Sequence, residues 1–290
     1  MIIDSFPFNK DFNTLKIRLA ELNDIVDVFI VAESSYTHSG KPKPLYLSEN
    51  IDEFKDYSKK LVVVQNNKKY ITLNPRIREL RQRQLISTYL KNYKLTINDL
   101  VIHSDCDEIP RRTVIENLAK VKRSYNILLE LDCYSTRLNL KAGLWARVRI
   151  VSGENYKSIA KLRQDIFLNK NYDLRRHRFP IIQVPDYWTH RYFGLWKFPQ
   201  IIFSKPSLQI IKNGGWHFNN LFAVENLIDK VEAFSHQELN TQEIRNQIIE
   251  RHQAGCDILH GTQFHFVPID ETFPEVIYKN QTLWSDFIGQ

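Results

Sequence analysis

Short apolar runs that alternate with helical segments over the first 135 residues constrain the fold more than any other feature of this sequence. Helices are predicted before and between these runs, beginning near Phe12, at Pro75 and near residue 113. Four runs have the length and apolar content of buried strands: "DVFIVAES" (27–34), "KLVVVQ" (60–65), "DLVIHSD" (99–105) and "NILLELDCYS" (126–135). This alternation predicts an α/β protein whose mostly parallel central sheet is flanked by helices.

The second half of the chain has a weaker pattern. A helical stripe runs from Val224 to Phe234, and a last helix begins near residue 242 and ends at Gly255. Short strand candidates are "RVRIV" (147–151), "FPIIQVP" (179–185) and "LQIIKNGG" (208–215). Because no repeat or linker divides the chain, we expect one domain over residues 1–290.

Composition limits the classes of function. With 43% hydrophobic and 25% charged residues, the chain has the composition of a globular protein. It has no apolar stretch of about 18 residues, and its opening "MIIDSFPFNK" does not have the form of a signal peptide. We therefore expect no transmembrane segment and a cytoplasmic location.

The cysteine count and the net charge give two further limits. Three cysteines in no metal-like spacing predict neither a disulfide framework nor a zinc site. The net charge of +7 favours an anionic partner such as a phosphate, nucleotide or nucleic acid.

Two of the predicted strands end in acids, and the carboxyl ends of parallel strands meet in the crevice where ligands bind. Glu33 ends one strand, and Asp105 and Asp107 end another. The spacing of Asp105 and Asp107 places both carboxylates on one side of an extended chain, where they can share Mg²⁺ or Mn²⁺. The alternative is an acidic turn in which Asp107 or Glu108 caps the next helix, and for an isolated pair of acids this alternative is the commoner case.

A histidine in "NGGWHFNN" (213–220) is a candidate third ligand. The paired glycines allow tight backbone geometry there, and the neutral imidazole of His217 can add a nitrogen ligand to the same metal. The alternative interpretation is that His217, one of nine histidines, is an ordinary hydrogen-bonded residue.

Six segments spread over most of the chain are more informative together than any one of them. They are "DSFPF" (4–8), "LKIRLAELNDIVDVFIVAES" (15–34), "THSGKPKPLY" (37–46), "HSDCDEIPR" (103–111), "GGWHF" (214–218) and "FSHQELN" (234–240). In this order they resemble the motifs of the family 17 glycosyltransferases. "IRLAEL" and "GKPKPL" make the resemblance much more specific than two spaced acids, whereas residues from about 155 to 210 correspond least.

The resemblance implies a GT-A (Rossmann-like) fold, a nucleotide-sugar donor that is typically UDP-N-acetylglucosamine, Mn²⁺ or Mg²⁺, and inversion at the anomeric carbon. Residues 1–125 would form the nucleotide-binding half and residues 126–290 the acceptor-binding half. Asp105 would approach the ribose and the metal, Asp107 would ligate the metal, and His217 resembles the downstream histidine ligand common in GT-A enzymes.

Three further residues are candidates for contacts with the nucleotide. Arg83 in "RELRQRQ" and Lys41 in "SGKPKP" carry groups that suit phosphate. Glu33, at the end of its strand, is the candidate for the uridine or ribose. For the two basic residues a solvated surface position is the alternative, because the chain has 40 Lys and Arg.

An inverting transfer also needs a general base that takes the proton of the acceptor hydroxyl. Glu225 ranks first because it opens the helix after "GGWHF", where a helix N-terminus can hold a carboxylate. Capping of that helix is an equally good explanation for Glu225. Glu238 in "FSHQELN" and Asp186 in "QVPDYW" are the other candidates.

We favour a metal-dependent inverting glycosyltransferase that acts on a glycan, glycolipid or glycoprotein, with no nucleic acid partner. The aromatic segment "DYWTHRYFGLWKF" (186–198) is a candidate acceptor platform, although core packing explains most such aromatics. One alternative is a metal-dependent phosphohydrolase or nuclease, but such two-metal sites usually need more ligands than are found here. The other is a nucleotide-sugar-binding protein without turnover.

Overall fold

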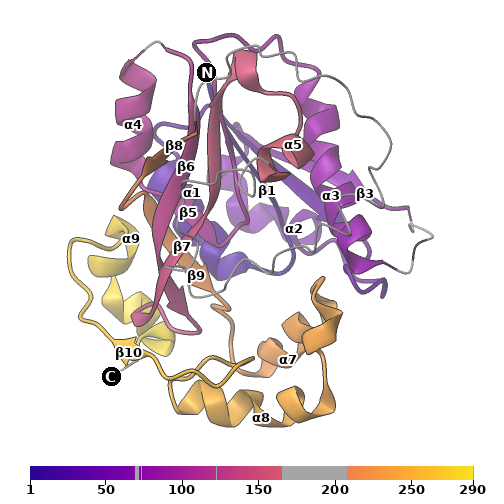
Figure 1. Ribbon diagram of the computed structural model, residues 1–290, viewed down its shortest axis with the longest axis vertical. Coiled ribbons are helices and arrows are strands. Elements are labelled where there is room, and N and C mark those ends of the chain that lie inside the picture. Colours follow the sequence, from indigo (N-terminus) through magenta and orange to yellow (C-terminus); the bar gives the residue numbers. More distant parts are fainter. Residues whose placement is uncertain (69–71, 73, 122, 165–207, 290) are drawn as a thin grey trace.

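A computed structural model describes residues 1–68, 72, 74–121, 123–164 and 208–289. They form a mixed α/β structure in which a large sheet is flanked by helices (Figure 1). The strands are β1 (Ile2–Pro7), β2 (Val28–Ser34), β3 (Leu61–Asn66), β4 (Leu100–His103), β5 (Glu108–Pro110), β6 (Asn126–Ser135), β7 (Leu140–Ser152), β8 (Gln209–Ile211), β9 (Gly215–Asn219) and β10 (His265–Phe266).

The α-helices differ widely in length, from four residues to sixteen. They are α1 (Phe12–Leu22), α2 (Tyr46–Glu49), α3 (Pro75–Leu90), α4 (Arg112–Lys120), α5 (Ile159–Gln164), α7 (Glu225–Ala233), α8 (Gln242–Gln253) and α9 (Glu275–Tyr278). Short 3-10 helices are η1 (Ile51–Tyr57), η2 (Gly153–Asn155), η4 (Gln237–Leu239) and η5 (Gln281–Phe287). None of the helices in the described ranges combines the length and apolarity needed to cross a membrane.

The strand order is β3-β2-β1-β4-β7-β6-β9-β5, and only its first part is parallel throughout. β3, β2, β1 and β4 run in one direction, whereas β7 is antiparallel to both of its neighbours, β4 and β6. Residues 136–139 join β6 to β7, and so short a connection can only form a hairpin, because a parallel crossover needs a dozen residues or more. The sheet as a whole is therefore mixed, so the expectation of a mostly parallel sheet is met only in part, by the run from β3 to β4 and by the pairing of β6 with β8 and β9.

Alternate residues of β2 pack on opposite faces of the sheet. Phe29 and Val31 join the core cluster that contains Leu15 of α1, whereas Ile30 joins the cluster that contains Ile86 of α3. α4 contributes to the first cluster and α5 to the second, and Figure 1 shows α4 and α3 on opposite sides of the sheet. Because both faces are covered, the strand is apolar at successive positions instead of alternating with polar residues.

The parallel strands end together at one edge of the sheet. In their registers, Pro7 of β1 lies beside Ala32 of β2, and Ser5 lies beside His103 of β4. Helices α7 and α8 lie beyond this edge, at the lower end of the molecule in Figure 1. The sheet contains strands from both residues 1–125 and residues 126–290. The assignment of nucleotide binding to the first of these halves and acceptor binding to the second stays a prediction.

Candidate active site

The acid loop, residues 104–108, follows β4 and carries three carboxylates in different surroundings. Asp105 has 31% of its side chain exposed and Asp107 has 13%, whereas Glu108 is fully buried. The Glu108 carboxylate accepts hydrogen bonds from the backbone N–H of Asp105 at 2.8 Å and from Nε1 of Trp145 at 2.7 Å. Through these two hydrogen bonds the buried Glu108 carboxylate stabilises the conformation of the acid loop. Helix α4 has no side-chain cap, so capping does not account for these acids.

Arg18 of α1 holds the backbone of the acid loop. Its fully buried guanidinium donates to the carbonyl oxygens of Asp105 at 2.9 Å and Glu108 at 2.8 Å, and to Oγ of Ser104 at 2.8 Å. The other side of the guanidinium forms a bidentate pair with Asp4, at 2.6 and 2.7 Å. The arginine of "IRLAEL" thus fixes the conformation in which the loop presents its acids.

His217 lies beside Asp107 because "GGWHF" forms β9, which pairs with β5 and places His217 opposite Glu108. Nε2 of His217 is 3.6 Å from Oδ2 of Asp107, and Nδ1 is 3.5 Å from Sγ of Cys133. Its ring lies 4.6 Å from that of Trp145, centroid to centroid. Burial lowers the pKa of the imidazole, but the Cys133 thiol and the Asp107 carboxylate outweigh burial and raise this pKa well above its usual value.

Arg83 of α3 reaches the same edge and pairs with Asp105. Nη2 of Arg83 is 2.5 Å from Oδ1 of Asp105 and 2.8 Å from Oε1 of Glu79, so one guanidinium bridges two carboxylates. Nη1 also lies 3.5 Å from Nε2 of His103, the last residue of β4. The predicted residues Arg83, Asp105, Asp107 and His217 therefore come together at one site.

Lys230 and Asp11 also belong to this cluster, although neither was among the residues predicted from the sequence. Nζ of Lys230, on α7, lies 3.2 Å from Oδ1 of Asp11 and 3.7 Å from Oδ2 of Asp107. Burial raises the pKa of Asp11 to about 6, against the opposing effect of Lys230. Lys230 lies within the helical stripe from Val224 to Phe234, so a basic residue inside a packing stripe was the available signal.

Two other predicted residues lie nearby with partners of their own. Glu33 is buried, and its carboxylate accepts hydrogen bonds from the backbone N–H groups of Leu47 at 2.7 Å and Ser48 at 3.1 Å, at the start of α2. Lys41 is exposed and pairs with Glu232 of α7 at 2.7 Å. Contacts of Glu33 or Lys41 with a nucleotide stay predictions.

Of the three candidate bases, Glu225 and Glu238 are not part of this cluster. Glu225 is the exposed first residue of α7. Glu238 lies in η4 with 51% of its side chain exposed, and it pairs with His236 at 2.9 Å and Arg76 at 3.4 Å. Asp186 and the aromatic segment 186–198 lie outside the described residues.

The donor types at the site fit a divalent cation. Asp107 offers carboxylate oxygens, and His217 can offer an imidazole nitrogen once a cation displaces the proton that Asp107 favours on the ring. Both donors suit Mn²⁺, while Mg²⁺ favours the oxygens. Within the described ranges, no group of three or more His, Cys, Asp or Glu side chains is arranged to hold a metal. A cation at this site would therefore take only some of its ligands from these residues, and the others from a bound substrate and water.

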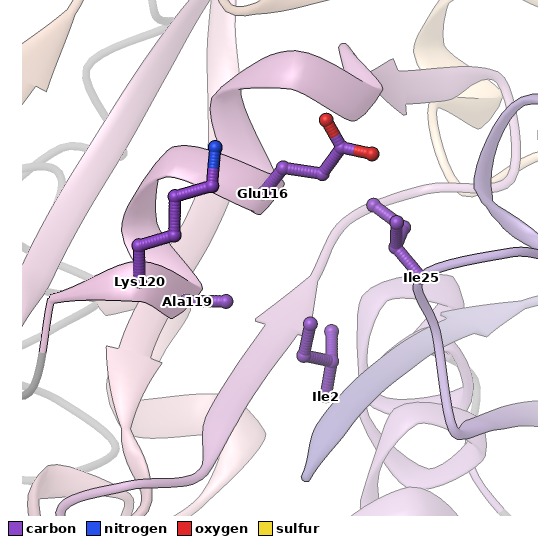
Figure 2. Close-up of a pocket in the computed structure, with 5 residues that line it drawn as sticks. All are labelled: Ile2, Ile25, Glu116, Ala119 and Lys120. Carbon is purple, nitrogen blue, oxygen red and sulfur yellow. The ribbon is translucent and has the colours of Figure 1, made fainter.

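A hollow of about 180 Å³, which we call the lysine hollow, adjoins the cluster through Lys230. Its lining comes from the loop after β1, the loop before α2 with the first residue of that helix, and α7 with the segment before it: Asn9, Lys10, Thr37, Lys41, Pro42, Lys43, Tyr46, Phe222, Asn226, Asp229, Lys230, Glu232 and Ala233. A more open hollow of about 420 Å³ is lined by Ile2, Ile25, Glu116, Ala119 and Lys120 (Figure 2). Because Ile2 begins β1, that second hollow lies at the opposite edge of the sheet from the acid loop.

Comparison with known proteins matches residues 1–163 to the model of glycosyltransferase family 17. Beta-1,4-mannosyl-glycoprotein 4-beta-N-acetylglucosaminyltransferases from Rattus norvegicus and Homo sapiens are 27% identical over 166 residues, which is 52% of this chain. The match spans only 29% and 30% of the length of those two relatives.

Among solved structures, HddC from Yersinia pseudotuberculosis has a TM-score of 0.33 and 13% identity, over 73% of this chain and 89% of that one. A likeness at this level does not establish a shared fold. The family match, in contrast, includes Asp11, Arg83 and the acid loop, although it ends before His217 and Lys230. Because the family model matches more than half of the chain, this protein belongs to glycosyltransferase family 17.

Proposed function

We propose that this protein is a metal-dependent inverting glycosyltransferase of the GT-A fold that transfers N-acetylglucosamine from UDP-N-acetylglucosamine. The observation that carries the proposal is the gathering of Asp105, Asp107, His217 and Arg83 at one edge of the sheet in a family 17 chain. The four parallel strands that lead to this edge support the GT-A assignment. The names of the relatives support N-acetylglucosamine as the sugar and a glycoprotein as the acceptor, and a glycan or glycolipid is the wider class that we propose with it.

In this proposal Asp107 and His217 hold Mn²⁺ or Mg²⁺, and Asp105 lies toward the ribose. The bound cation would neutralise the negative charge that develops on the departing diphosphate. The protein adds positive charge of its own through Arg83, which is paired with Asp105, and Lys230, which lies 3.7 Å from Asp107. These two groups can shift toward phosphate oxygens when a nucleotide enters, because ammonium and guanidinium groups both bind phosphate.

The transfer forms a bond from the acceptor hydroxyl oxygen to the anomeric carbon and breaks the bond from that carbon to the diphosphate oxygen. A carboxylate takes the hydroxyl proton, and UDP leaves. Glu225, Glu238 and Asp186 stay the candidates for this base. Replacing the base with the matching amide should lower kcat while the affinity for UDP-N-acetylglucosamine is kept, and an amide variant with unchanged kcat removes that residue from the candidates.

The experiment that tests the proposed donor site is a calorimetric titration with UDP-N-acetylglucosamine, with and without Mn²⁺. We expect binding that requires the metal in the wild-type protein and is lost in Asp107→Asn, which keeps the side-chain volume. Glu116→Gln, at the opposite edge of the sheet, is the matched control and should bind like the wild type.

Two results would contradict the proposal. The first is binding of equal strength with and without metal, or in the wild type and Asp107→Asn. The second is release of inorganic phosphate from phosphate esters by the wild type but not by Asp107→Asn, since that would favour a phosphohydrolase.

A further inference from the structure

Positive charge gathers around the lysine hollow. Its charged lining consists of four lysines and two acids, a formal charge of +2: Lys10, Lys41, Lys43, Lys230, Asp229 and Glu232. The lysines come from three segments that are far apart in the sequence, namely the loop after β1, the loop before α2, and α7. The fold thus brings ammonium groups from separate elements around one small volume, where each increases the attraction for an anion.

Two of these lysines are paired with the acids of α7. Nζ of Lys10 lies 3.4 Å from Oδ2 of Asp229, and Nζ of Lys41 lies 2.7 Å from Oε2 of Glu232. Both acids are exposed enough for water to weaken the pairs, with 67% of the Asp229 side chain and 37% of the Glu232 side chain accessible. An anion that enters the hollow can therefore displace these pairs at small energetic cost.

Lys43 differs from the other three lysines. In the part of the chain that the structure describes, no carboxylate forms an ion pair with Lys43. Its ammonium lies 5.0 Å from the centre of the Tyr46 ring and donates to the carbonyl oxygen of Pro44 at 3.4 Å. Burial lowers the pKa of Lys43, because a partly buried cation is poorly hydrated. Such a group gains more than a fully solvated lysine when an anion binds.

The size of the hollow limits what it can hold. Its volume of about 180 Å³ is below the range of roughly 300–1,000 Å³ that is typical of clefts enclosing a whole drug-sized ligand. It therefore suits one charged group and not an entire nucleotide sugar. Lys230 connects the hollow to Asp107, so a group bound there lies next to the proposed metal site.

We propose that the lysine hollow is a subsite for a phosphate-bearing group whose oxygens are held by Lys10, Lys43 and Lys230. This inference deepens the proposed function and rests on it for the source of the group. The source that the position beside Asp107 favours is the diphosphate of the donor. A phosphate on the acceptor has the same chemistry and is the other source.

The test uses the full chain in calorimetric titrations with inorganic pyrophosphate, in buffer without divalent metal. Lys43→Met should raise the Kd for pyrophosphate about tenfold, as expected for the loss of one charge-assisted contact. Asp229→Asn should lower the Kd several-fold, because this acid competes with the anion for Lys10. Lys120→Met, in the other hollow, is the matched control and should leave the Kd unchanged. Opposite shifts in Lys43→Met and Asp229→Asn cannot both result from misfolding.

Equal Kd values for Lys43→Met, Lys120→Met and the wild type would overturn the subsite, and so would a higher Kd in Asp229→Asn. Competition between UDP and pyrophosphate, with the same response to Lys43→Met, supports the donor as the source. Binding of glucose 6-phosphate that depends on Lys43 while UDP is saturating supports the acceptor instead.

The same data separate this inference from the proposed function. If UDP-N-acetylglucosamine binds with Mn²⁺, and Lys43→Met changes the Kd of neither UDP-N-acetylglucosamine nor pyrophosphate, the subsite is wrong and the donor assignment stands. If pyrophosphate shows the lysine pattern but no UDP-sugar binds, the subsite stands and the donor assignment is wrong.

Discussion

The buried ion pair between Arg18 and Asp4 offers the sharpest prediction about stability. Both side chains are fully buried, and Arg18 also carries the backbone of the acid loop through the carbonyl oxygens of Asp105 and Glu108. Arg18→Met keeps an unbranched side chain of similar shape but leaves the carboxylate of Asp4 without its partner inside the core. We expect this variant to lose stability and to bind UDP-N-acetylglucosamine poorly, because the loop loses its support.

The expected magnitude follows from the burial of the pair. Removing one partner of a buried ion pair costs about 3–5 kcal/mol, because an uncompensated charge is left away from water. Asp4→Leu should cost a similar amount. In the double variant no charge is left unpaired, so its loss should be smaller than the sum of the two single losses by about 2 kcal/mol or more. The loss of stability that remains in the double variant reflects the hydrogen bonds that Arg18 no longer donates to the acid loop.

Urea unfolding of the wild type, the two single variants and the double variant measures these free energies directly. Arg112→Met is the matched control, because Arg112 has 40% of its side chain exposed and pairs with Asp24 and Glu116 at the surface. Its loss should be below about 1 kcal/mol. The coupling of Arg18 and Asp4 would be contradicted if the losses of unfolding free energy in the two single variants added up in the double variant. It would also be contradicted if either single loss were no larger than that of Arg112→Met.

Three further predictions concern single residues. Gly215→Ala should destabilise the protein by more than about 3 kcal/mol in urea unfolding, because φ is +148° and the new Cβ would lie 2.1 Å from the carbonyl oxygen of Ile109. A smaller loss of stability would contradict this, since it would mean that β5 and β9 can move apart at little energetic cost. Burial raises the pKa of Glu79, but Arg83 and its other neighbours outweigh burial and lower this pKa from 4.5 to about 2. The ionised carboxylate therefore stabilises the fold fully above pH 4.5, and this stabilisation is lost as the pH falls toward 2. The free energy of unfolding of Glu79→Gln should be lower than that of the wild type by up to about 3 kcal/mol at pH 7, and this difference should disappear on acidification. Trp145→Phe should cost about 1–3 kcal/mol, because a buried carboxylate of the acid loop loses its indole donor; thermal unfolding that matches the wild type would contradict this.

Elements that depend on local pattern could be predicted from the sequence. The run at 27–34 forms β2 and the run at 126–135 forms β6, while the helix predicted to begin at Pro75 does so. Gly255 follows α8 with a φ of +66°, the conformation expected of a glycine that ends a helix. These features depend on neighbours within one or two turns or strands, so the sequence pattern contains the needed information.

The arrangement of the sheet could not be predicted in the same way. β7, thirteen residues long, inserts between β4 and β6 and makes the sheet mixed, whereas its sequence showed only "RVRIV" as a short strand candidate. The pairing of a strand depends on partners that are distant in the sequence, and periodicity does not identify those partners. For the same reason the internal role of Glu108 was not apparent, since its donor Trp145 is 37 residues away.

For the candidate site, the residue types at the end of a buried strand could be predicted from the sequence: Asp105 and Asp107 after β4, with an arginine in "RELRQRQ" and a histidine in "GGWHF" as expected companions. Tertiary packing, in contrast, places His217 3.6 Å from Asp107 and brings Lys230 and Asp11 to the same site. This difference arises because a strand end is encoded by its own residues. The charges that meet there come from elements up to 219 residues apart, and only packing of the sheet and α7 brings them within reach.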